Sequence, residues 1–221
     1  TDWVSHRPII LEFLLHQSGV LNMIPEKWGA IWIPIVHDAM LGFLDHLSDD
    51  RLLDKLVGLA MLPPNTSAGD YLVEFVSKVP SLQKMGHIIA RNPDLAPEYR
   101  TALQGLENGI HTMTRDELVQ FITQDIGKPG IDKYQIQFAD KILAEASVGA
   151  TMRATYISPG TTTRQQMIFK VVKPYVLAYL PEDLAIIDGL AEYFTVNHDF
   201  YNLGSLPLVD LFREIRKALS N

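Results

Sequence analysis

The chain of 221 residues contains no cysteine. This absence excludes disulfide bonds, thiolate catalysis and cysteine metal sites, and it leaves the redox compartment open. Positive charge is also scarce, because 19 lysines and arginines stand against 26 aspartates and glutamates, for a formal net charge of -7. Nucleic-acid binding depends on the neutralisation of many phosphates, so we expect no nucleic-acid partner.

Long hydrophobic runs are lacking as well. The most apolar stretch, "WGAIWIPIVHDAMLGFL" at residues 28–44, is shorter than a comfortable bilayer span and is interrupted by a proline, a histidine and an aspartate. No signal peptide is visible. We therefore expect an intracellular protein, soluble or peripherally bound to a membrane, with buried helices here. Shallow membrane contact through Trp28 and Trp32 is the alternative.

Helical patterns occupy the chain up to about residue 140. Hydrophobic residues make up 47% of the sequence, which predicts a folded protein with an ample core. Pro8 and Pro34 suit the first turns of two helices, and residues 62–70 contain the residue types of a loop. Thr114 and Glu117 form a candidate capping box at the start of another helix.

The pattern changes near residue 140 to the alternation of β-strands. "GATMRATYIS" and "RQQMIFKVV" flank a turn at residues 158–163, and in the second segment Met167, Phe169 and Val171 share one face. We expect an antiparallel hairpin beside a third short strand, followed by helices headed by Pro181 and preceded by Ser205. The predicted fold class is α+β and predominantly α-helical.

One run of small residues stands out, "AEASVGA" at residues 144–150, between two candidate strands. Small side chains in a turn allow backbone N–H groups to approach a ligand closely, as loops that bind phosphate require. Lys170 follows within "MIFKVVKP", where a strand lysine can hold a phosphate as a point charge. Taken alone, an alanine-rich turn is more often a site of close packing, and a strand lysine more often lies on a solvated face.

Four blocks in sequence order strengthen this interpretation. "QKMGHIIARNPDLAPEYRTALQGLENGI" is similar to a Lys-x-Gly-Gln motif and its following Pro, Asp, Leu, Pro and Tyr pattern. "AEASVGATMRA" is similar to an alanine-rich nucleotide loop, "MIFKVVKP" to a nucleotide-lysine strand, and "LPEDLAIIDGLA" to the helix that follows it. Over about residues 72–221 the chain resembles the UbiB/AarF-like atypical kinases, which are associated with ubiquinone and other isoprenoid-lipid metabolism.

We predict three regions, of which only residues 1–70 lie outside the resemblance, and the resemblance implies two sets of site residues. Residues 1–70 would be a helical region of unknown role, residues 71–139 a helical extension over the nucleotide cleft, and residues 140–221 part of a kinase-like small lobe. Asp183 would occupy the family's usual acidic position. The expected nucleotide-binding residues are Lys170, Ala144, Ala146, Ser147, Gly149 and Lys84, and the expected regulatory motif is Lys84, Gly86 and His87, on a helix that Pro93 and Pro97 would end.

The chain also departs from the family's pattern. His87 and Ala150 stand where the family has glutamine, and no His-Gly-Asp or Asp-Phe-Gly sequence occurs. The resemblance implies ATP as a ligand, but Mg²⁺ only in an intact longer protein, because the metal-binding motifs belong to a second lobe. We expect no catalytic residue or metal site in this chain. It would be an N-terminal fragment or a degenerate relative, that is, a pseudokinase.

Two alternatives remain open at the level of sequence. The first is a non-catalytic helical interaction domain, whose partner would be a protein or a lipid surface. The second is a metal site around His37 and Asp38, which would need further histidines and aspartates as ligands. Packing on a helix explains this pair better, so we expect no metal site here.

Overall fold

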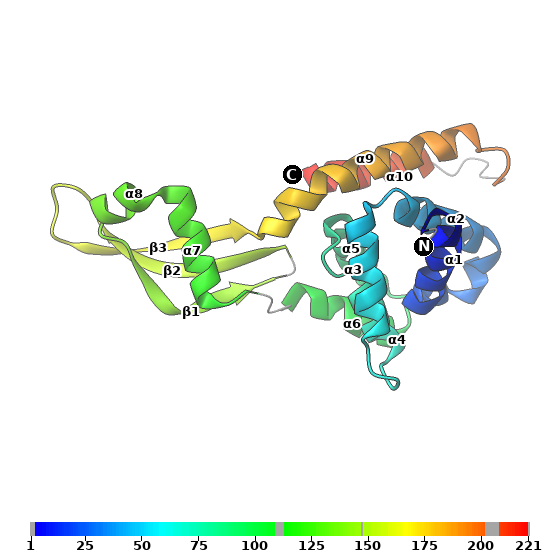
Figure 1. The fold of residues 1–221 in the computed structure, drawn as a ribbon, viewed down its shortest axis with the longest axis horizontal. Helices are drawn as coiled ribbons and strands as arrows, with labels where there is room; N and C mark the ends of the chain where they lie inside the picture. The colour runs from blue at the N-terminus through cyan, green and yellow to red at the C-terminus, as the bar shows by residue number, and fades with distance from the viewer. Residues whose placement is uncertain (1–2, 109–112, 147, 202–207, 221) are drawn as a thin grey trace. The chain divides into compact units, whose positions relative to one another are not determined.

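The structure is a computed structural model that describes residues 3–108, 113–146, 148–201 and 208–220 (Figure 1). The chain divides into two compact units. We call residues 1–104 with 178–221 the helical unit, and residues 105–177 the sheet unit. The predicted regions 1–70, 71–139 and 140–221 were assigned by role and stay a prediction.

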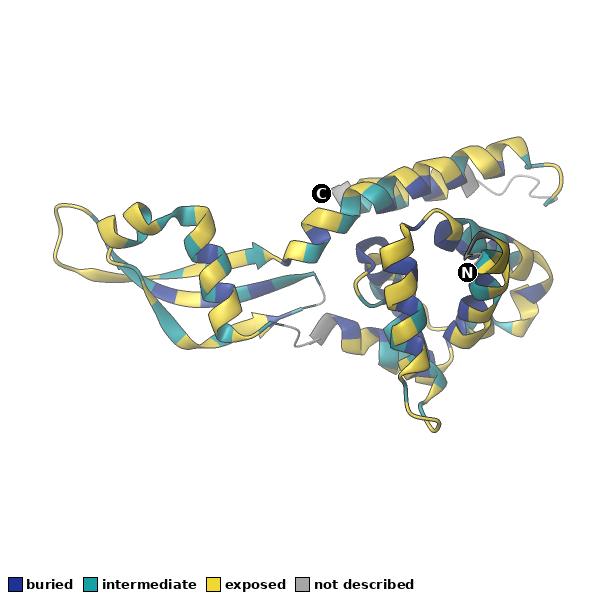
Figure 2. Cartoon of the chain, viewed as in Figure 1, coloured by how far each residue is buried: buried dark blue, intermediate teal, exposed yellow. Residues whose placement is uncertain are grey.

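The helical unit is built from amphipathic helices around a leucine-rich core. Figure 2 shows buried segments on several of its helices. Fully buried side chains include Leu14, Leu52, Leu72, Phe75 and Phe194. The helices that contribute to this unit are α1 (Trp3–Ser18), η1 (Val20–Met23), α2 (Glu26–Asp45), α3 (Asp49–Ala60), α4 (Ala68–Val76), α5 (Pro80–Ile89), α6 (Pro97–Asn108), α9 (Pro174–Val196) and α10 (Leu208–Ser220).

Three predicted helix starts were wrong. Pro8 lies inside α1, Pro34 inside α2 and Pro181 inside α9. The start of α2 is marked instead by Pro25 as its N-terminal flanking residue, and α9 begins at Pro174. A proline within a helix removes one backbone hydrogen bond.

The helix that carries the predicted regulatory motif ends as expected. α5 stops at Ile89, before Pro93. Pro97, however, does not end a helix. It is the first residue of α6, where its missing N–H has no helical partner to lose.

The sheet unit contains three antiparallel strands in the order β1 (Gln137–Glu145), β2 (Gly149–Ile157) and β3 (Arg164–Val172). This confirms the predicted small antiparallel sheet followed by two helices. The predicted turn joins β2 to β3 and contains Gly160 at a φ of 84°. Two helices precede the sheet, α7 (Arg115–Ile126) and the unpredicted α8 (Lys128–Lys133).

The predicted capping box at the start of α7 is confirmed. Thr114 N–H donates to the Glu117 carboxylate at 2.7 Å, and Glu117 N–H donates to Thr114 Oγ1 at 3.3 Å. The two bonds satisfy backbone donors that a helix N-terminus otherwise leaves free. They fix where α7 begins against the sheet.

One face of the sheet is covered and the other is open. Leu118 and Ile122 of α7 pack on Ala150 and Met152 of β2, all four buried. Because side chains alternate along a strand, the neighbouring residues emerge on the opposite face. We call this the open face. On the two paired strands β2 and β3 it carries Thr151, Arg153, Thr155, Gln166, Ile168 and Lys170.

The apolar helices predicted to be buried are only partly so. Trp28 is 47% exposed and Ile31 is 47% exposed, both in α2. Among the described helices, none combines the length and the apolarity needed to cross a membrane.

Candidate functional site

The loop predicted to approach phosphates is a tight connection between β1 and β2. β1 ends at Glu145 and β2 begins at Gly149. Ala146 N–H donates to the Gly149 carbonyl at 2.8 Å, and Lys173 N–H donates to the Val148 carbonyl at 2.9 Å. These two hydrogen bonds join the two ends of loop 144–150 to each other and to the residue that follows β3. Ser147, one of the predicted binding residues, lies outside the described residues.

Gly149 is required by the packing of the backbone at this point. A Cβ atom on Gly149 would lie 3.0 Å from the Val171 carbonyl oxygen of β3. Such a contact is tighter than side chains normally make, so the two strands would have to move apart. Backbone packing therefore explains the presence of glycine at this position, whether or not a ligand binds.

Lys170 lies on the open face beside this loop. It is exposed and pairs with Thr151 across the ladder, while Gly149 pairs with Val172. Lys170 and Gly149 are therefore diagonal neighbours on one face, which in antiparallel sheets places such positions about 7–8 Å apart. Lys170 makes no hydrogen bond or ion pair with any residue that the structure describes. Its ammonium group is available to an anion.

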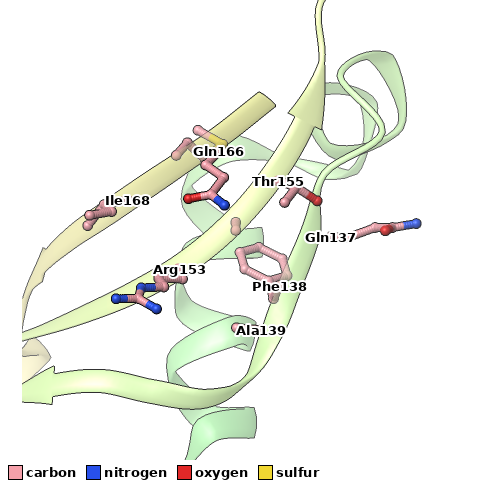
Figure 3. A pocket seen from close by; sticks show the side chains of 9 residues that line it. Gln137, Phe138, Ala139, Arg153, Thr155, Gln166 and Ile168 are labelled. Carbon is pink, nitrogen blue, oxygen red and sulfur yellow. The ribbon is translucent and has the colours of Figure 1, made fainter. Parts of the chain in front are cut away.

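The open face carries a second cation that the sequence reasoning did not select. Arg153 is exposed, lies opposite Ile168 in the ladder, and has no hydrogen-bonding or ionic partner within the described part of the chain. It borders a hollow of about 790 Å³ that crosses all three strands (Figure 3). Amide, aromatic and aliphatic side chains complete the lining, among them Gln137, Phe138, Gln166 and Ile168.

A buried ion pair lies under the loop. Lys173 Nζ is 2.8 Å from Glu145 Oε1, and the two side chains are 2% and 1% exposed. Glu145 Oε1 also accepts a hydrogen bond from Met113 N–H at 3.1 Å. Sequence reasoning missed both charges, since Glu145 sits within a run of small residues and Lys173 follows the more conspicuous Lys170. The only available signal was an acidic residue inside an otherwise alanine-rich turn.

Comparison with known proteins identifies no family. No family model matches the chain, and no solved structure matches it significantly. A curated relative, the uncharacterized protein sll1770 of Synechocystis sp., is 29% identical over 126 residues. The match spans 57% of this chain and 20% of that protein's length. The chain therefore corresponds to about a fifth of this relative.

The predicted regulatory motif lies on α5 in the helical unit. Lys84 is exposed and makes no hydrogen bond or ion pair with the residues that the structure places, Gly86 is buried, and His87 is half-buried in the last turn. Lys84 and Lys170 belong to different units. That both contact one nucleotide stays a prediction.

Asp183, the expected acidic position of the last family block, has a structural role within the helical unit. It is fully buried, pairs with Arg51 at 2.7 Å, and accepts a hydrogen bond from Ser81 N–H at 2.9 Å. It thereby joins α9 to α3 and to the first turn of α5. Neighbouring Glu182 also pairs with Arg51, at 2.8 Å.

The environment of Glu182 favours its charged form. Partial burial acts to raise its pKa, but the hydrogen bonds from Arg51 and from Ser48 N–H outweigh burial and lower the pKa below the ordinary value. The carboxylate therefore stays ionised beside the guanidinium. Arg51 is further held by the ring of Tyr179, whose centroid lies 4.5 Å from the guanidinium carbon.

His37 and Asp38 take part in a hydrogen-bonded chain on the surface of the helical unit. His37 Nδ1 lies 2.8 Å from Asp38, and its Nε2 lies 3.5 Å from Glu12. The Tyr201 hydroxyl donates to Asp38, and burial together with this bond raises the pKa of Tyr201 above its ordinary value. Within the described residues, no three histidines or carboxylates gather in a way that could hold a metal ion.

Proposed function

We propose that these residues are the N-terminal part of a UbiB/AarF-like atypical kinase or ATPase, and that the sheet unit binds the phosphates of ATP through loop 144–150 and Lys170. The observation that carries the proposal is the position of Lys170. It is an unpartnered lysine on the uncovered face of the sheet, diagonal to Gly149 of the tight loop. The four sequence blocks support the same assignment.

The chemistry of the site favours a polyanionic ligand. Lys170 and Arg153 share the open face without a carboxylate partner among the described residues, so an arriving phosphate does not have to displace an ion pair. The Ala146 N–H is already used by Gly149. The main electrostatic contact with phosphate is therefore assigned to the Lys170 ammonium, and the small loop residues allow the close approach.

The proposal concerns binding and not phosphoryl transfer. In kinase-like enzymes the transfer depends on metal ions held by motifs that the resemblance places in a second lobe. Mg²⁺ would enter only in a longer protein that carries that lobe. Lys84 and the rest of the regulatory motif would limit access to the nucleotide, as the resemblance implies.

The proposal is tested by ATP-dependent thermal stabilisation of the full chain. ATP at ten times its dissociation constant stabilises the folded state by about 1.4 kcal/mol, a shift of a few degrees. We expect the shift in the wild type and in Lys128→Ala, an exposed lysine at the start of α8. Lys170→Ala should abolish it. An equal shift in Lys170→Ala would exclude the assigned role of this residue.

A second candidate function comes from the exposed apolar residues of α2. Trp28 and Ile31 lie one helical turn apart and are both about half exposed, and Lys27 lies 5.7 Å from the centre of the Trp28 ring. A tryptophan beside a lysine is typical of contact with a lipid surface. Co-sedimentation with uncharged phosphatidylcholine vesicles tests this function, and Trp28→Ser should reduce binding.

A further inference from the structure

We propose that the Glu145–Lys173 ion pair is a positioning clamp that holds the two ends of loop 144–150, residues 144–146 and 148–150, at a fixed distance from Lys170 before any ligand arrives. The inference deepens the proposed function and rests on it where ATP binding is concerned. Neither Glu145 nor Lys173 would touch the nucleotide. Both would act through the loop.

The pair joins two strands that are not neighbours. In the order β1-β2-β3, the outer strands are separated by β2. Glu145 is the last residue of β1, and Lys173 is the first residue after β3. Their contact at 2.8 Å thus passes across the beginning of β2, where Gly149 and Ala150 pair with β3. The ion pair thereby joins the two outer strands at the end of the sheet that carries loop 144–150.

The backbone couples this contact to the loop. Lys173 N–H donates to the Val148 carbonyl at 2.9 Å, so the residue that holds Glu145 through its side chain holds the loop through its main chain. Lys170 lies three residues earlier in the same segment. A shift of Lys173 would therefore change the separation between the loop and the Lys170 ammonium group.

The burial of the pair indicates that geometry, more than stability, is its contribution. Transfer of two charges out of water costs several kcal/mol per ion, and their attraction often only offsets this loss. With side chains 1% and 2% exposed, the pair contributes little to the surface charge of the site. The pair holds the ends of the three strands in one arrangement. This preorganisation favours binding, because fewer groups have to be ordered when the ligand arrives.

A charge-only account of the pair makes an opposite prediction for one variant. If only local charge mattered, Glu145→Gln would leave Lys173 as an additional cation and would tighten ATP binding. Lys173→Met would weaken it. The clamp predicts that both variants weaken ATP binding, because each one releases the loop.

The test uses the full chain and the ATP dissociation constant measured by calorimetry. We expect Glu145→Gln and Lys173→Met each to weaken binding by about tenfold, because the loop would then have to be ordered when ATP binds. The exchanged pair Glu145→Lys with Lys173→Glu restores the contact and should recover most of the affinity. Unchanged or tighter binding by Glu145→Gln would overturn the clamp.

Amide hydrogen exchange over residues 144–150 tests the clamp without any nucleotide. Glu145→Gln should accelerate exchange in this segment and leave α3 unchanged. Unaltered exchange would overturn the clamp even if ATP binds. If the wild type does not bind ATP, the proposed function fails, and accelerated exchange would still support the clamp. Glu145→Asp, which keeps the charge and shortens the side chain, gives the same readout if Glu145→Gln does not fold.

Discussion

The helical unit and the sheet unit each contain a buried ion pair, in different surroundings. In the helical unit, Arg51 and Asp183 are enclosed by α3, α5 and α9. Their hydrogen bonds to each other, to Glu182 and to Ser81 N–H join these three helices. In the sheet unit, Lys173 and Glu145 lie at the end of a sheet whose open face carries Lys170 and Arg153, which have no hydrogen-bonding or ionic partner among the described residues. Buried charge thus organises the helices in one unit and, we propose, a binding surface in the other.

The two units also differ in how completely their elements are covered. The helical unit buries its apolar residues on several helices, whereas the sheet unit buries one sheet face under α7. A sheet with one solvated face is stable when its covered face is well packed. The open face is then free to vary in residue type for binding. The following predictions separate the residues that hold each unit together from those that could bind.

The largest effect is expected from loss of the buried carboxylate in the helical unit. Asp183→Ala leaves Arg51 without its closest buried partner and removes the acceptor for Ser81 N–H. Such a change destabilises proteins by about 3–5 kcal/mol. Urea unfolding measures it. The matched control is Asp188→Ala, whose pair with Arg216 is about half exposed and should contribute less than about 1 kcal/mol. Similar values for both variants would contradict the contrast.

The next largest loss of stability is expected from a substitution on the covered face of the sheet, compared with one on the open face. Met152 is fully buried against α7, and Ile168 is 60% exposed on the open face. Met152→Ala should reduce the free energy of unfolding by about 2–5 kcal/mol through the cavity that it creates. Ile168→Ala should change it by less than about 0.5 kcal/mol. A larger loss for Ile168→Ala would mean that the open face is covered in solution.

A smaller effect concerns a buried lysine in the helical unit. Lys55 Nζ donates to the Glu74 carbonyl at 2.9 Å and to the Ser77 carbonyl at the end of α4. Burial lowers the pKa of Lys55 from 10.5 to about 8, against the opposing charge of Glu74. Between these pH values the folded chain releases a proton that the unfolded chain retains. The stability contributed by Lys55 therefore rises with pH from about 8 to about 10.5.

The measurement is the free energy of unfolding of the wild type minus that of Lys55→Met at each pH. This difference should increase by about 2 kcal/mol between pH 8 and pH 10. Lys55→Met lacks the titrating group. Subtraction of its free energy of unfolding from that of the wild type removes the pH dependence contributed by every other residue. A constant difference would show that the pKa of Lys55 is not shifted by folding, and a falling difference would show that folding raises it.

The smallest effect is expected at the start of α7. Thr114→Ala removes one half of the capping box and should cost about 1 kcal/mol. Since Leu118 and Ile122 of α7 pack on the sheet, hydrogen exchange should accelerate in the sheet unit and stay unchanged in α1 to α4. Equal acceleration in both units would show that they unfold together.

Local patterns in the sequence predicted most of the sheet unit. The alternation of Met167, Phe169 and Val171 with exposed neighbours gave the covered and open faces of β3, and Thr114 with Glu117 marked the start of α7. These features depend on residues a few positions apart. Chain-local periodicity and capping chemistry are sufficient to specify them.

The features that sequence reasoning missed depend on contacts between distant residues. Arg51 and Asp183 are 132 positions apart, and their pairing requires α9 to pack on the N-terminal helices. The Glu145–Lys173 contact requires the register of three strands. The helix starts predicted at Pro8 and Pro34 were wrong for a related reason, since tertiary packing overrides the local preference of proline for a helix start. The position of Lys170 near the loop was expected, whereas its neighbour Arg153 was not.

The most direct test is the dissociation constant for ATP, measured by calorimetry on the wild type, Lys170→Ala and Lys128→Ala. The account predicts measurable binding by the wild type and by Lys128→Ala, with binding lost in Lys170→Ala. Equal affinity of Lys170→Ala and the wild type, or no binding by the wild type at millimolar ATP, would contradict it.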